Sequence, residues 1–324
     1  NGYQKFHFTK VLNQQSIFTM INETAKNPLV SVIMNCHNGE TYLKESISSL
    51  INQTYKNWEL IFWDNFSSDS SKEVLMQFSD KRIKYYYTKN FTPLYEARNL
   101  AIKKTSGEFI SFLDTDDWWS PKRLEKQIEL FFKDKNLDVV YTNFYFFYNK
   151  TKTRKIVSKK NLPDGKITQK LLSNYNIGGI LTALCKKKIF QTKQFIGKYE
   201  IIGDFDFFVN VSLSSFFGCI QEPLAYYRVH GSNTSLRKIH LHIQELESWL
   251  KNNKIKDHLK NYSFKGVIFV LQSLKIKKSF LDGDKIAALQ EIIKSPFNFK
   301  KYKFLILFFI PRKKISFLLI DKFL

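Results

Sequence analysis

The first half of the chain repeats one pattern, in which a short apolar run precedes a polar loop and then apolar residues at helical spacing. Residues 29–34 form the first apolar run, residues 35–40 are polar, and residues 42–50 carry apolar side chains three and four positions apart. A second unit follows, with a strand predicted at 58–63 and a short helix at 72–78. The apolar period therefore changes from that of a strand to that of a helix twice in succession.

The same alternation continues beyond the second unit. The pattern predicts an edge strand at 82–87, a helix at 94–104, a core strand at 109–113 and a helix at 121–132 that has proline in its first turn. Repeated alternation of strands and helices is typical of a mostly parallel sheet covered by helices. We therefore predict an α/β fold, to which the aromatic-rich stretch 139–148 adds strand in a second half of the sheet.

Length and composition allow this sheet to form one large domain with an appendage. The chain has 324 residues, of which 44% are hydrophobic and 16% are aromatic, and this is enough to bury a full core. We predict an N-terminal extension at 1–27, the main α/β domain at 28–235 and a basic, mainly helical region at 236–324.

Membrane spanning and disulfide bonding are both disfavoured. No run approaches the roughly 18 to 20 apolar residues that cross a bilayer, and the N-terminus lacks the basic start and apolar core of a signal peptide. Cys36, Cys185 and Cys219 are odd in number, far apart and without metal-ligand spacing. We therefore expect a cytoplasmic protein with reduced thiols.

The chain is strongly basic, with 51 Lys and Arg against 29 Asp and Glu and a formal net charge of +22. Residues 236–324 hold 19 basic and 7 acidic residues, a net of +12, which predicts attraction to anionic lipid, nucleic acid or phosphorylated substrate. Residues 264–280 interleave apolar residues with Lys, and residues 302–320 join an apolar stretch to a basic cluster, as in a peripheral anchor on the inner face of the cytoplasmic membrane. An apolar helix packed on the main domain, with solvated lysines, is an equally good explanation.

The clearest chemical signal is the triplet Asp114, Asp116 and Asp117, directly after the strand at 109–113. Carboxylates two positions apart at a strand end can converge on one hard divalent cation, and Mg²⁺ or Mn²⁺ held in this way keeps positions open for phosphate oxygens. An acidic turn that caps the helix beginning near Pro121 is the alternative explanation.

Polar loops follow three of the predicted strands, beginning at Asn35, Asp64 and Asp114. In parallel sheets ligands bind at the carboxyl ends of the strands, so these loops together predict a nucleotide pocket. The sequence contains no Gly-x-Gly-x-x-Gly segment and no Walker-type loop, which disfavours a Rossmann dehydrogenase and a P-loop enzyme.

Several ordered segments within residues 28–235 resemble the family-2 inverting glycosyltransferases of GT-A fold, of the type that assembles bacterial glycans. They are Leu29-Val-Ser-Val-Ile-Met-Asn-Cys-His-Asn-Gly-Glu, Trp58-Glu-Leu-Ile-Phe-Trp-Asp-Asn, Ala97-Arg-Asn-x-Ala-Ile, Gly107-Glu-Phe-Ile-Ser-Phe-Leu-Asp-Thr-Asp-Asp, Ile202-Gly-Asp-Phe-Asp-Phe-Phe and Leu224-Ala-Tyr-Tyr-Arg-Val-His-Gly-Ser-Asn-Thr-Ser. The resemblance implies a GT-A, Rossmann-like mixed sheet and transfer of a sugar from a nucleotide diphosphate.

The resemblance also implies a divalent cation, Mn²⁺ or Mg²⁺, on the pyrophosphate of the donor, where it stabilises the leaving group. Asp116 is its first ligand, Asp114 lies beside the ribose and the metal, and Asp117 is a supporting residue. His230 occupies a segment in which some relatives place a histidine near the cation or the diphosphate. For His230 the alternative is a polar packing residue, and for Asp117 it is a charge at a helix N-terminus.

Inversion requires a general base on the face opposite the leaving group, and the resemblance assigns this role to Asp204. Flanking aromatic residues can desolvate its carboxylate and raise its pKa. Many relatives carry Glu before this Asp, whereas this chain has Gly203, so Asp206 is a competing candidate.

The donor site implied by the resemblance comprises Asn35, His37, Asn38, Glu40, Asn65, Arg98, Asp114, Thr115 and Asp116. A UDP-sugar is the favoured donor. The first two loops depart from the pattern of UDP-sugar enzymes, which often carry Thr-x-Tyr-Asn and then Asp-Asp; a base can nevertheless stack on His37 or bond to the Asn65 amide. For Arg98, the alternative is a solvated charge on a helix.

The acceptor is expected to be a glycan or a lipid-linked glycan, and no nucleic acid is expected as a partner. Two other classes remain open from the residues alone. A nucleotidyltransferase can use paired Asp residues on a similar sheet, and a non-catalytic module that binds nucleic acid or another anionic surface explains the charge. Release of a nucleoside diphosphate indicates sugar transfer, release of pyrophosphate indicates nucleotidyl transfer, and a steep salt dependence without turnover indicates the module.

Overall fold

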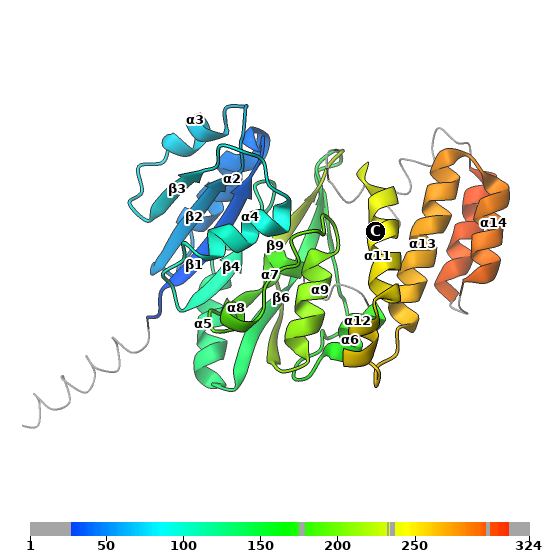
Figure 1. Ribbon diagram of the computed structural model, residues 1–324. Helices are drawn as coiled ribbons and strands as arrows, with labels where there is room; N and C mark the ends of the chain where they lie inside the picture. Colours follow the sequence, from blue (N-terminus) through cyan, green and yellow to red (C-terminus); the bar gives the residue numbers. More distant parts are fainter. Residues whose placement is uncertain (1–26, 175–178, 232, 234–236, 296–298, 311–324) are drawn as a thin grey trace, which may run out of the picture.

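The computed structural model of the protein describes residues 27–174, 179–231, 233, 237–295 and 299–310, shown in colour in Figure 1. The predicted N-terminal extension 1–27 therefore lies outside the described residues except for residue 27, as does the predicted boundary at 235/236. The predicted anchor at 302–320 is described only as far as residue 310.

One mixed sheet organises the molecule, with strand order β3-β2-β1-β4-β8-β6-β9-β5 and β7 paired with β6. Strands β1 to β4 are mutually parallel and β6 is parallel to β9, whereas β5, β7 and β8 are antiparallel to their neighbours. The predicted mostly parallel sheet is confirmed, and β3 lies at its edge as expected. The strands are β1 (Val30–Cys36), β2 (Trp58–Asp64), β3 (Ile83–Tyr87), β4 (Phe109–Phe112), β5 (Trp118–Trp119), β6 (Leu137–Tyr148), β7 (Thr153–Ile156), β8 (Leu184–Lys186) and β9 (Phe216–Val229).

Helices cover both faces of this sheet, and the four predicted helices of the first half begin and end within two residues of the expected positions. The helices are α2 (Glu40–Ile51), α3 (Ser71–Met76), α4 (Leu94–Ile102), α5 (Arg123–Lys133), α6 (Thr168–Asn174), α7 (Gly179–Thr182), α8 (Ile189–Thr192), α9 (Gly203–Ser212), α11 (Ile239–Lys251), α12 (Asn253–His258), α13 (Lys265–Asp282), α14 (Lys285–Lys294) and the 3₁₀ helix η1 (Phe299–Phe309).

The side chains of each strand divide between two apolar cores. Along β1, Ile33 packs with α4 and α9 on one face of the sheet, whereas Val32 and Met34 pack with α2 and α5 on the other. A strand buried on both faces has an almost continuous apolar sequence, and this is why residues 29–34 show no alternation.

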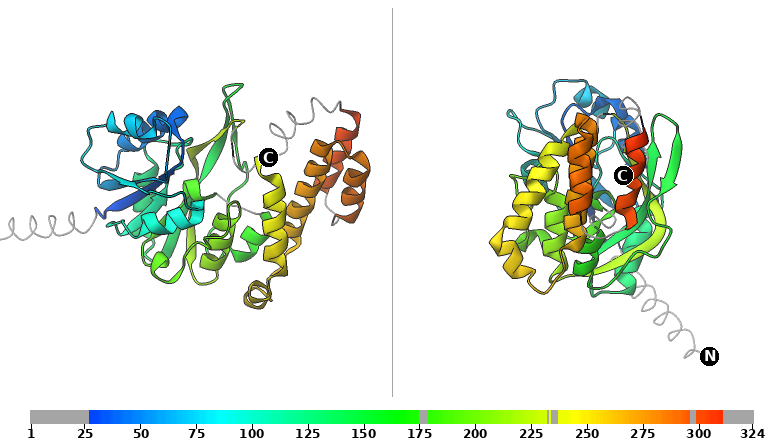
Figure 2. Two further views of the ribbon diagram at one scale, coloured as in Figure 1. Left: turned by 45° about the horizontal axis from the view of Figure 1, so that its top comes forward. Right: turned by 90° about the vertical axis from the view of Figure 1, so that its right-hand side faces the viewer.

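The C-terminal helices α11, α13 and α14 lie side by side at one end of the sheet (Figures 1 and 2). Trp249 of α11 and Val267 of α13 belong to the same apolar core as α4 and α9. A Cβ at Gly266 would lie 2.3 Å from the carbonyl oxygen of Ser173, so α13 begins in close contact with α6. Helix α14 and η1 form a smaller core with the end of α13. Among the described residues, no helix has the length and apolarity needed to cross a bilayer.

Candidate active site

Three loops meet at the carboxyl ends of β1, β2 and β4. The strand register places Asn35 beside Trp63 and Ile33 beside Phe112, so the loops that follow these strands leave the sheet together. The β1–α2 loop and the β2–α3 loop are joined by hydrogen bonds, since Ser68 N donates to Asn38 Oδ1 at 2.8 Å and Ser70 N donates to Glu40 Oε2 at 2.8 Å. The Asn38 and Glu40 side chains therefore bind the protein itself and shape the loop.

Two other residues of the predicted donor site offer groups to a ligand. The amide nitrogen of Asn35 is buried and has no hydrogen-bond partner among the residues that the structure describes. The His37 ring is exposed, its Nδ1 donates to the Asn65 carbonyl oxygen at 3.0 Å, and it meets the edge of Phe91 at a centroid distance of 4.7 Å. An unsatisfied amide donor and an exposed aromatic pair suit a polar ligand with a planar ring.

The Asn65 amide is engaged within the protein. Its Nδ2 donates to the Thr92 carbonyl at 2.7 Å, and its Oδ1 accepts from Thr92 Oγ1 at 2.9 Å. These bonds hold the loop between β3 and α4 against the end of β2. Direct hydrogen bonding of a base by this amide requires these bonds to open, so the predicted base contact of Asn65 stays a prediction.

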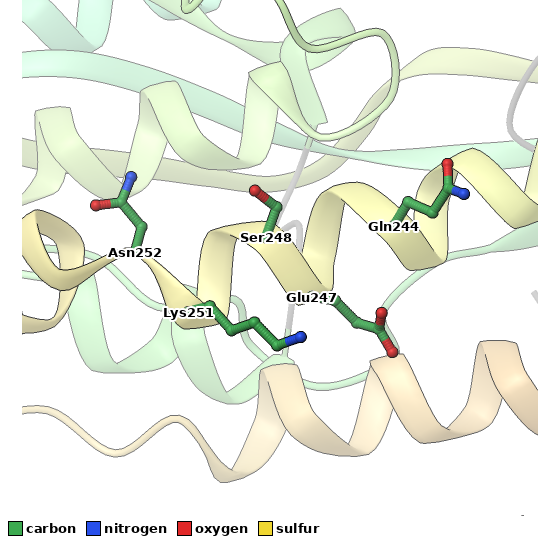
Figure 3. A pocket seen from close by; sticks show the side chains of 5 residues that line it. All are labelled: Gln244, Glu247, Ser248, Lys251 and Asn252. Carbon is green, nitrogen blue, oxygen red and sulfur yellow. The ribbon is translucent and has the colours of Figure 1, made fainter.

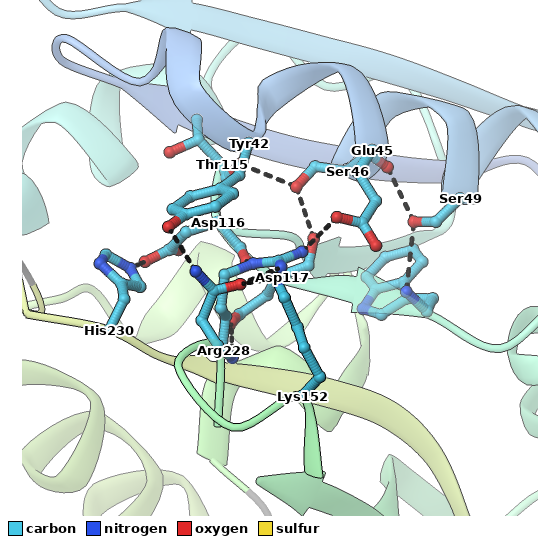
Figure 4. A network of polar contacts seen from close by, with 12 residues as sticks. Tyr42, Glu45, Ser46, Ser49, Thr115, Asp116, Asp117, Lys152, Arg228 and His230 are labelled. Atoms are coloured by element: carbon cyan, nitrogen blue, oxygen red, sulfur yellow. Dashed lines mark hydrogen bonds and ion pairs between the residues drawn. The ribbon is translucent and has the colours of Figure 1, made fainter. Parts of the chain in front are cut away.

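Residues 114–117 form a tight loop after β4, and α2 holds it in place (Figure 4). The Ser46 hydroxyl lies 2.8 Å from the Thr115 carbonyl and 2.5 Å from the Asp117 carbonyl, to which it can donate. A Cβ at Gly39 would lie 2.9 Å from Thr115 Oγ1, so glycine at this position lets the first loop approach the third. Thr115 thus lies where the two loops touch.

Arg98 joins two of the predicted site carboxylates. From the buried face of α4, its Nη1 donates to Asp204 Oδ1 at 2.6 Å and its Nη2 donates to Asp114 Oδ1 at 3.0 Å. Asp204 lies in the first turn of α9 and Asp114 lies in the loop after β4, so one guanidinium on α4 connects α9 with this loop. The interpretation of Arg98 as a solvated helix charge is wrong, because the side chain is almost fully buried between these carboxylates.

The environment of Asp204 makes its carboxyl group less acidic than that of an ordinary aspartate. Burial raises the pKa of Asp204 to about 6, while the positive charge of Arg98 acts in the opposite direction. Burial also raises the pKa of Asp114, again against the influence of Arg98. A carboxylate with a pKa near 6 is ionised at neutral pH and is a stronger proton acceptor than an ordinary aspartate.

Steric contact with a neighbouring helix explains why residue 203 is glycine. A Cβ at Gly203 would lie 2.5 Å from the ring of Tyr95, which is too close for any side chain. Tyr95 lies one turn before Arg98 on α4; its ring contacts the Arg98 guanidinium and its hydroxyl donates to the Ile201 carbonyl at 3.1 Å. Tyr95 therefore takes the space in which a larger residue before Asp204 would stand.

Asp206 differs from Asp204 in its surroundings. It is buried, and its Oδ1 accepts from Trp249 Nε1 of α11 at 2.8 Å. Burial raises the pKa of Asp206, and the Trp249 bond acts against that rise. Asp204 is partly accessible and faces Arg98, so the geometry favours Asp204 over Asp206 as the group that meets an acceptor.

Asp116 and His230 converge on one point, as Figure 4 shows. Asp116 Oδ2 lies 2.9 Å from His230 Nε2, and the His230 ring packs on Tyr42 of α2 at a centroid distance of 5.1 Å. These atoms come from the β4 end, the β9 end and α2. The predicted pairing of Asp116 with His230 near one cation is therefore geometrically possible.

Arg228 and Asp117 fasten this loop to β9. Arg228 Nε donates to the Asp116 carbonyl at 2.8 Å, Nη2 donates to Glu45 Oε2 at 2.5 Å, and the guanidinium lies 4.4 Å from the Trp118 ring centroid. Asp117 Oδ1 accepts from Arg228 N at 2.8 Å. Burial raises the pKa of Asp117 well above its ordinary value, and the neighbouring carboxylates add to the rise. Asp117 is thus a buried support of the loop and not an exposed helix charge.

A divalent cation fits this donor set with help from a ligand. Carboxylate and imidazole both bind Mn²⁺, and Mg²⁺ is commonly held by one or two carboxylates together with phosphate oxygens. Among the described residues no group of three His, Cys, Asp or Glu side chains is arranged to hold a metal by itself. Asp116 and His230 supply two converging donors, and a diphosphate would complete the set.

A surface hollow elsewhere on the molecule contains none of the predicted site residues. Figure 3 shows it along α11, far along the chain from the strand ends that carry the aspartates. It is lined by Gln244, Glu247, Ser248, Lys251 and Asn252.

Several site residues escape a reading of the sequence. Tyr95, Tyr42 and Ser46 look like ordinary helix residues, and only packing brings them close to Asp204, to His230 or to the loop at 114–117. Glu45, the ion-pair partner of Arg228, likewise carries no sequence signal. The sequence gives one signal for Phe91, because it is an aromatic residue in a polar loop next to a predicted strand.

Comparison of the sequence with known proteins identifies a family. The model of Glycosyl transferase family 2 matches residues 31–192. UDP-Glc:alpha-D-GlcNAc-diphosphoundecaprenol beta-1,3-glucosyltransferase WfgD of Escherichia coli is 41% identical over 156 residues, which cover 48% of this chain and 60% of WfgD. The glycosyltransferase MJ1057 of Methanocaldococcus jannaschii is 31% identical over 251 residues, which cover 75% of this chain and 83% of that protein.

Solved structures support the fold. The mannosyltransferase PcManGT from Pyrobaculum calidifontis, solved with GDP-Man and Mn²⁺, superposes with a TM-score of 0.58 at 13% identity and covers 90% of this chain and 84% of its own. The alignment with WfgD spans less than two thirds of the length of that relative. The family match, the MJ1057 alignment and the shared fold agree, and the chain therefore belongs to glycosyl transferase family 2 and has the GT-A fold.

Proposed function

We propose that this protein is a metal-dependent, inverting glycosyltransferase that moves a sugar from a nucleotide diphosphate to a hydroxyl group of a glycan or lipid-linked acceptor. The observation that carries the proposal is the Arg98 bridge between Asp204 and Asp114. The Asp204 carboxyl group, with a pKa of about 6, lies next to the loop predicted to hold the donor, and this supports its proposed role as the general base. Bacterial surface polysaccharide, lipooligosaccharide or glycoprotein glycan synthesis is the setting we propose.

The proposed reaction is a single displacement. The Asp204 carboxylate takes the proton of the acceptor hydroxyl while the acceptor oxygen forms a bond to the anomeric carbon of the sugar. The bond from that carbon to the diphosphate oxygen breaks on the opposite side, so the configuration inverts and a nucleoside diphosphate leaves. Arg98 keeps Asp204 oriented and ionised before the acceptor arrives.

The donor we propose is a UDP-sugar. The exposed rings of His37 and Phe91 offer a surface for the base, and the buried Asn35 amide nitrogen at the end of β1 has no hydrogen-bond partner among the described residues. The name of WfgD states UDP-Glc as the donor of that relative, which supports uridine for this chain. Thr115 and Asp114 lie between these loops and Arg98, where the ribose and the diphosphate are expected.

The cofactor we propose is Mn²⁺ or Mg²⁺, held by Asp116 and His230, with Asp114 nearby. When bound, the ion would neutralise the negative charge that develops on the leaving diphosphate. Arg228 and Ser46 fix the backbone of this loop, so the Asp116 carboxylate is held in place before any ligand binds. PcManGT has the same fold and was solved with Mn²⁺, which supports this ion for the present chain.

The acceptor we propose is a lipid-linked glycan. The name of WfgD gives a GlcNAc-diphosphoundecaprenol as the acceptor of that relative. Such an acceptor places the reaction at the inner face of the cytoplasmic membrane, where the protein would be peripheral.

The test compares UDP, GDP, CDP and their common sugar conjugates in thermal unfolding, with and without Mn²⁺, and then measures products. A ligand that binds only the native state raises the melting temperature, by an amount that grows with its concentration over Kd. We expect a metal-dependent rise with one nucleotide and release of the nucleoside diphosphate when acceptor is added. Release of pyrophosphate, or stabilisation by no nucleotide, would contradict the proposal.

The Asp116→Ala variant tests the cation site in the same assay. We expect it to lose the Mn²⁺-dependent part of the melting-temperature rise, because the variant removes one of the two converging donors. Glu125→Ala on α5 removes a carboxylate that bonds Thr54 and touches none of the site residues, so it serves as a control. Unchanged metal dependence in Asp116→Ala would place the cation elsewhere.

A further inference from the structure

We propose that the outer side of α14 and η1 binds the surface of an anionic lipid bilayer. The α14 apolar face, defined here as Ile286, Leu289 and Ile293, is exposed, and so is Phe309 of η1. These elements lie at the end of the molecule remote from β1 and β2 (Figure 1). The inference adds a contact surface to the proposed function and does not depend on sugar transfer.

The α14 apolar face is not a part of the core. Ile286 and Ile293 are 73% and 71% exposed, and with Leu289 they follow the spacing i, i+3, i+7, which places them on one side of the helix. Ala288 and Ile292 face the other way and are buried against α13 and η1. The helix therefore has two apolar sides, and the protein covers one of them.

The neighbouring helix η1 repeats this arrangement. Phe304 and Leu307 are buried in the small core with α14, whereas Phe309 is 89% exposed and Ile306 is exposed as well. Lys285 Nζ donates to the Phe308 carbonyl at 2.8 Å, which ties the start of α14 to the end of η1. Two adjacent elements thus expose large apolar side chains at one end of the molecule.

The charge around these elements selects the partner. Helix α14 carries Lys285 and Lys294 at its two ends, and Lys294 pairs with Glu291 of the same helix at 3.7 Å. In the sequence, the apolar run at 304–310 is preceded by Lys300, Lys301 and Lys303 and followed by Arg312, Lys313 and Lys314. Exposed apolar side chains in a segment whose sequence is rich in basic residues suit a bilayer surface with anionic headgroups. A protein partner would have to supply an acidic rim around an apolar centre.

The test measures co-sedimentation of the full-length chain with vesicles of phosphatidylcholine alone and of phosphatidylcholine with phosphatidylglycerol, without donor or acceptor. We expect binding to the anionic vesicles only, and weaker binding as salt rises, because salt screens the basic groups. The double variant Ile286→Ser/Ile293→Ser should weaken binding about tenfold or more, since two large apolar side chains no longer enter the lipid.

A control variant shows whether vesicle binding depends on the α14 apolar face or on any exposed apolar side chain. Met76 of α3 is 56% exposed on a different part of the protein, so Met76→Ser should leave vesicle binding unchanged. The double variant should keep the wild-type melting temperature, since both side chains are exposed, and the elution volume in size-exclusion chromatography should not change.

Three results would overturn the inference: no binding to anionic vesicles, equal binding by the double variant, or a melting temperature several degrees lower in that variant. The last result would mean that protein covers the face, and a simultaneous change of oligomeric state would identify that protein as a second copy. No step of this test involves turnover. Failure of vesicle binding and failure of sugar transfer can therefore be told apart, because each is measured without the other.

Discussion

The Arg98 guanidinium donates to Asp204 at 2.6 Å and to Asp114 at 3.0 Å, so the proposed base and the donor loop share one cation. Without that positive charge, burial alone would raise the pKa of Asp204 further. With it, the carboxylate stays ionised at neutral pH and keeps enough basicity to accept a proton. Arg98 is therefore a positioning residue that acts through Asp204.

Replacing Asp204 by Asn tests the base directly. We expect Asp204→Asn to lower kcat by about 10²- to 10⁴-fold, because the amide cannot accept the acceptor proton. Binding of the donor nucleotide, measured by calorimetry with Mn²⁺, should stay close to that of the wild type, since the cation site is untouched. Asp206→Asn is the comparison, and a larger loss in that variant than in Asp204→Asn would exchange the two assignments.

The pH dependence of kcat/KM tests the environment of Asp204. Only the ionised carboxylate accepts a proton, so activity should fall as pH drops through about 6, the pKa of this group in the folded protein. Arg98→Gln should move this acidic limb to higher pH, because the charge that favours the carboxylate is lost. Arg98→Lys keeps a positive charge and should move the limb less. If the acidic limb has the same pH midpoint in Arg98→Gln as in the wild type, the limb reports the ionisation of a group other than Asp204.

At this scale the sequence predicts residue types better than contacts. Asp114 and Asp204 stand in recognisable segments, but their shared partner lies 16 residues before one and 106 before the other. The choice between Asp204 and Asp206 depends on Trp249, which belongs to a helix beyond the segment itself. Asn65 was expected to face a base, and its bonds to Thr92 arise from loop packing that no local pattern encodes.

At the scale of elements, the contact between α4 and α9 positions the base. Helix α9 begins at Gly203, directly against the Tyr95 ring of α4. The close approach fixes the distance between Arg98 on one helix and Asp204 on the other. The geometry of the ion pair is thus a consequence of helix packing.

Gly203→Ala tests this contact. Its Cβ would lie 2.5 Å from the Tyr95 ring, so we expect a loss of about 1–3 kcal/mol in the free energy of unfolding, which lowers the melting temperature by several degrees. The control is Gly197→Ala, whose Cβ would meet Glu96 at an ordinary distance of 3.5 Å. Thermal unfolding of both variants gives the comparison, and equal effects would show that the ring moves aside.

The elements with a strong local period were predictable, and the others depend on distant pairing. Strands β1, β2 and β4 are continuous apolar runs, and α2 and α5 show clear helical spacing. Strand β8 has three residues and exists because it fits between β4 and β6. Strand β5 has two residues and forms only by pairing with β9. No short-range pattern predicts elements of this kind.

At the scale of the whole molecule, the C-terminal region shares a core with the sheet domain. Trp249 and Leu246 of α11 are buried in the same cluster as Phe207 of α9 and Ile33 of β1. The sequence predicted a basic, mainly helical region, and the helices α11 to α14 agree with this. Its packing on the main domain was one of two explanations for the apolar positions, and α13 buries Val267 and Leu271 in this way.

Trp249→Phe tests the link between the two regions. The variant keeps most of the ring but removes the N–H that bonds Asp206, so we expect a loss of about 1–3 kcal/mol in the free energy of unfolding. Without that bond the pKa of Asp206 in the folded protein rises further, because the ionised carboxylate loses a stabilising donor. The loss in the free energy of unfolding should therefore be larger at pH 8, where the carboxylate is ionised, than at pH 5. Trp63→Phe is the control, since Trp63 Nε1 has no hydrogen-bond partner among the described residues. A loss that does not change with pH would assign the effect to packing alone.

The bond between Trp249 and Asp206 also bears on how such enzymes diversify. Exchange of C-terminal helices between relatives by recombination would leave the Asp206 carboxylate buried without its indole partner unless the incoming helix restored a donor at the same place. Asp206 lies two residues after the proposed base Asp204. A new C-terminal segment would therefore have to supply a hydrogen-bond donor at the position of Trp249 Nε1. We expect lineages of this protein to change acceptor preference through loop substitutions more readily than through exchange of whole C-terminal segments.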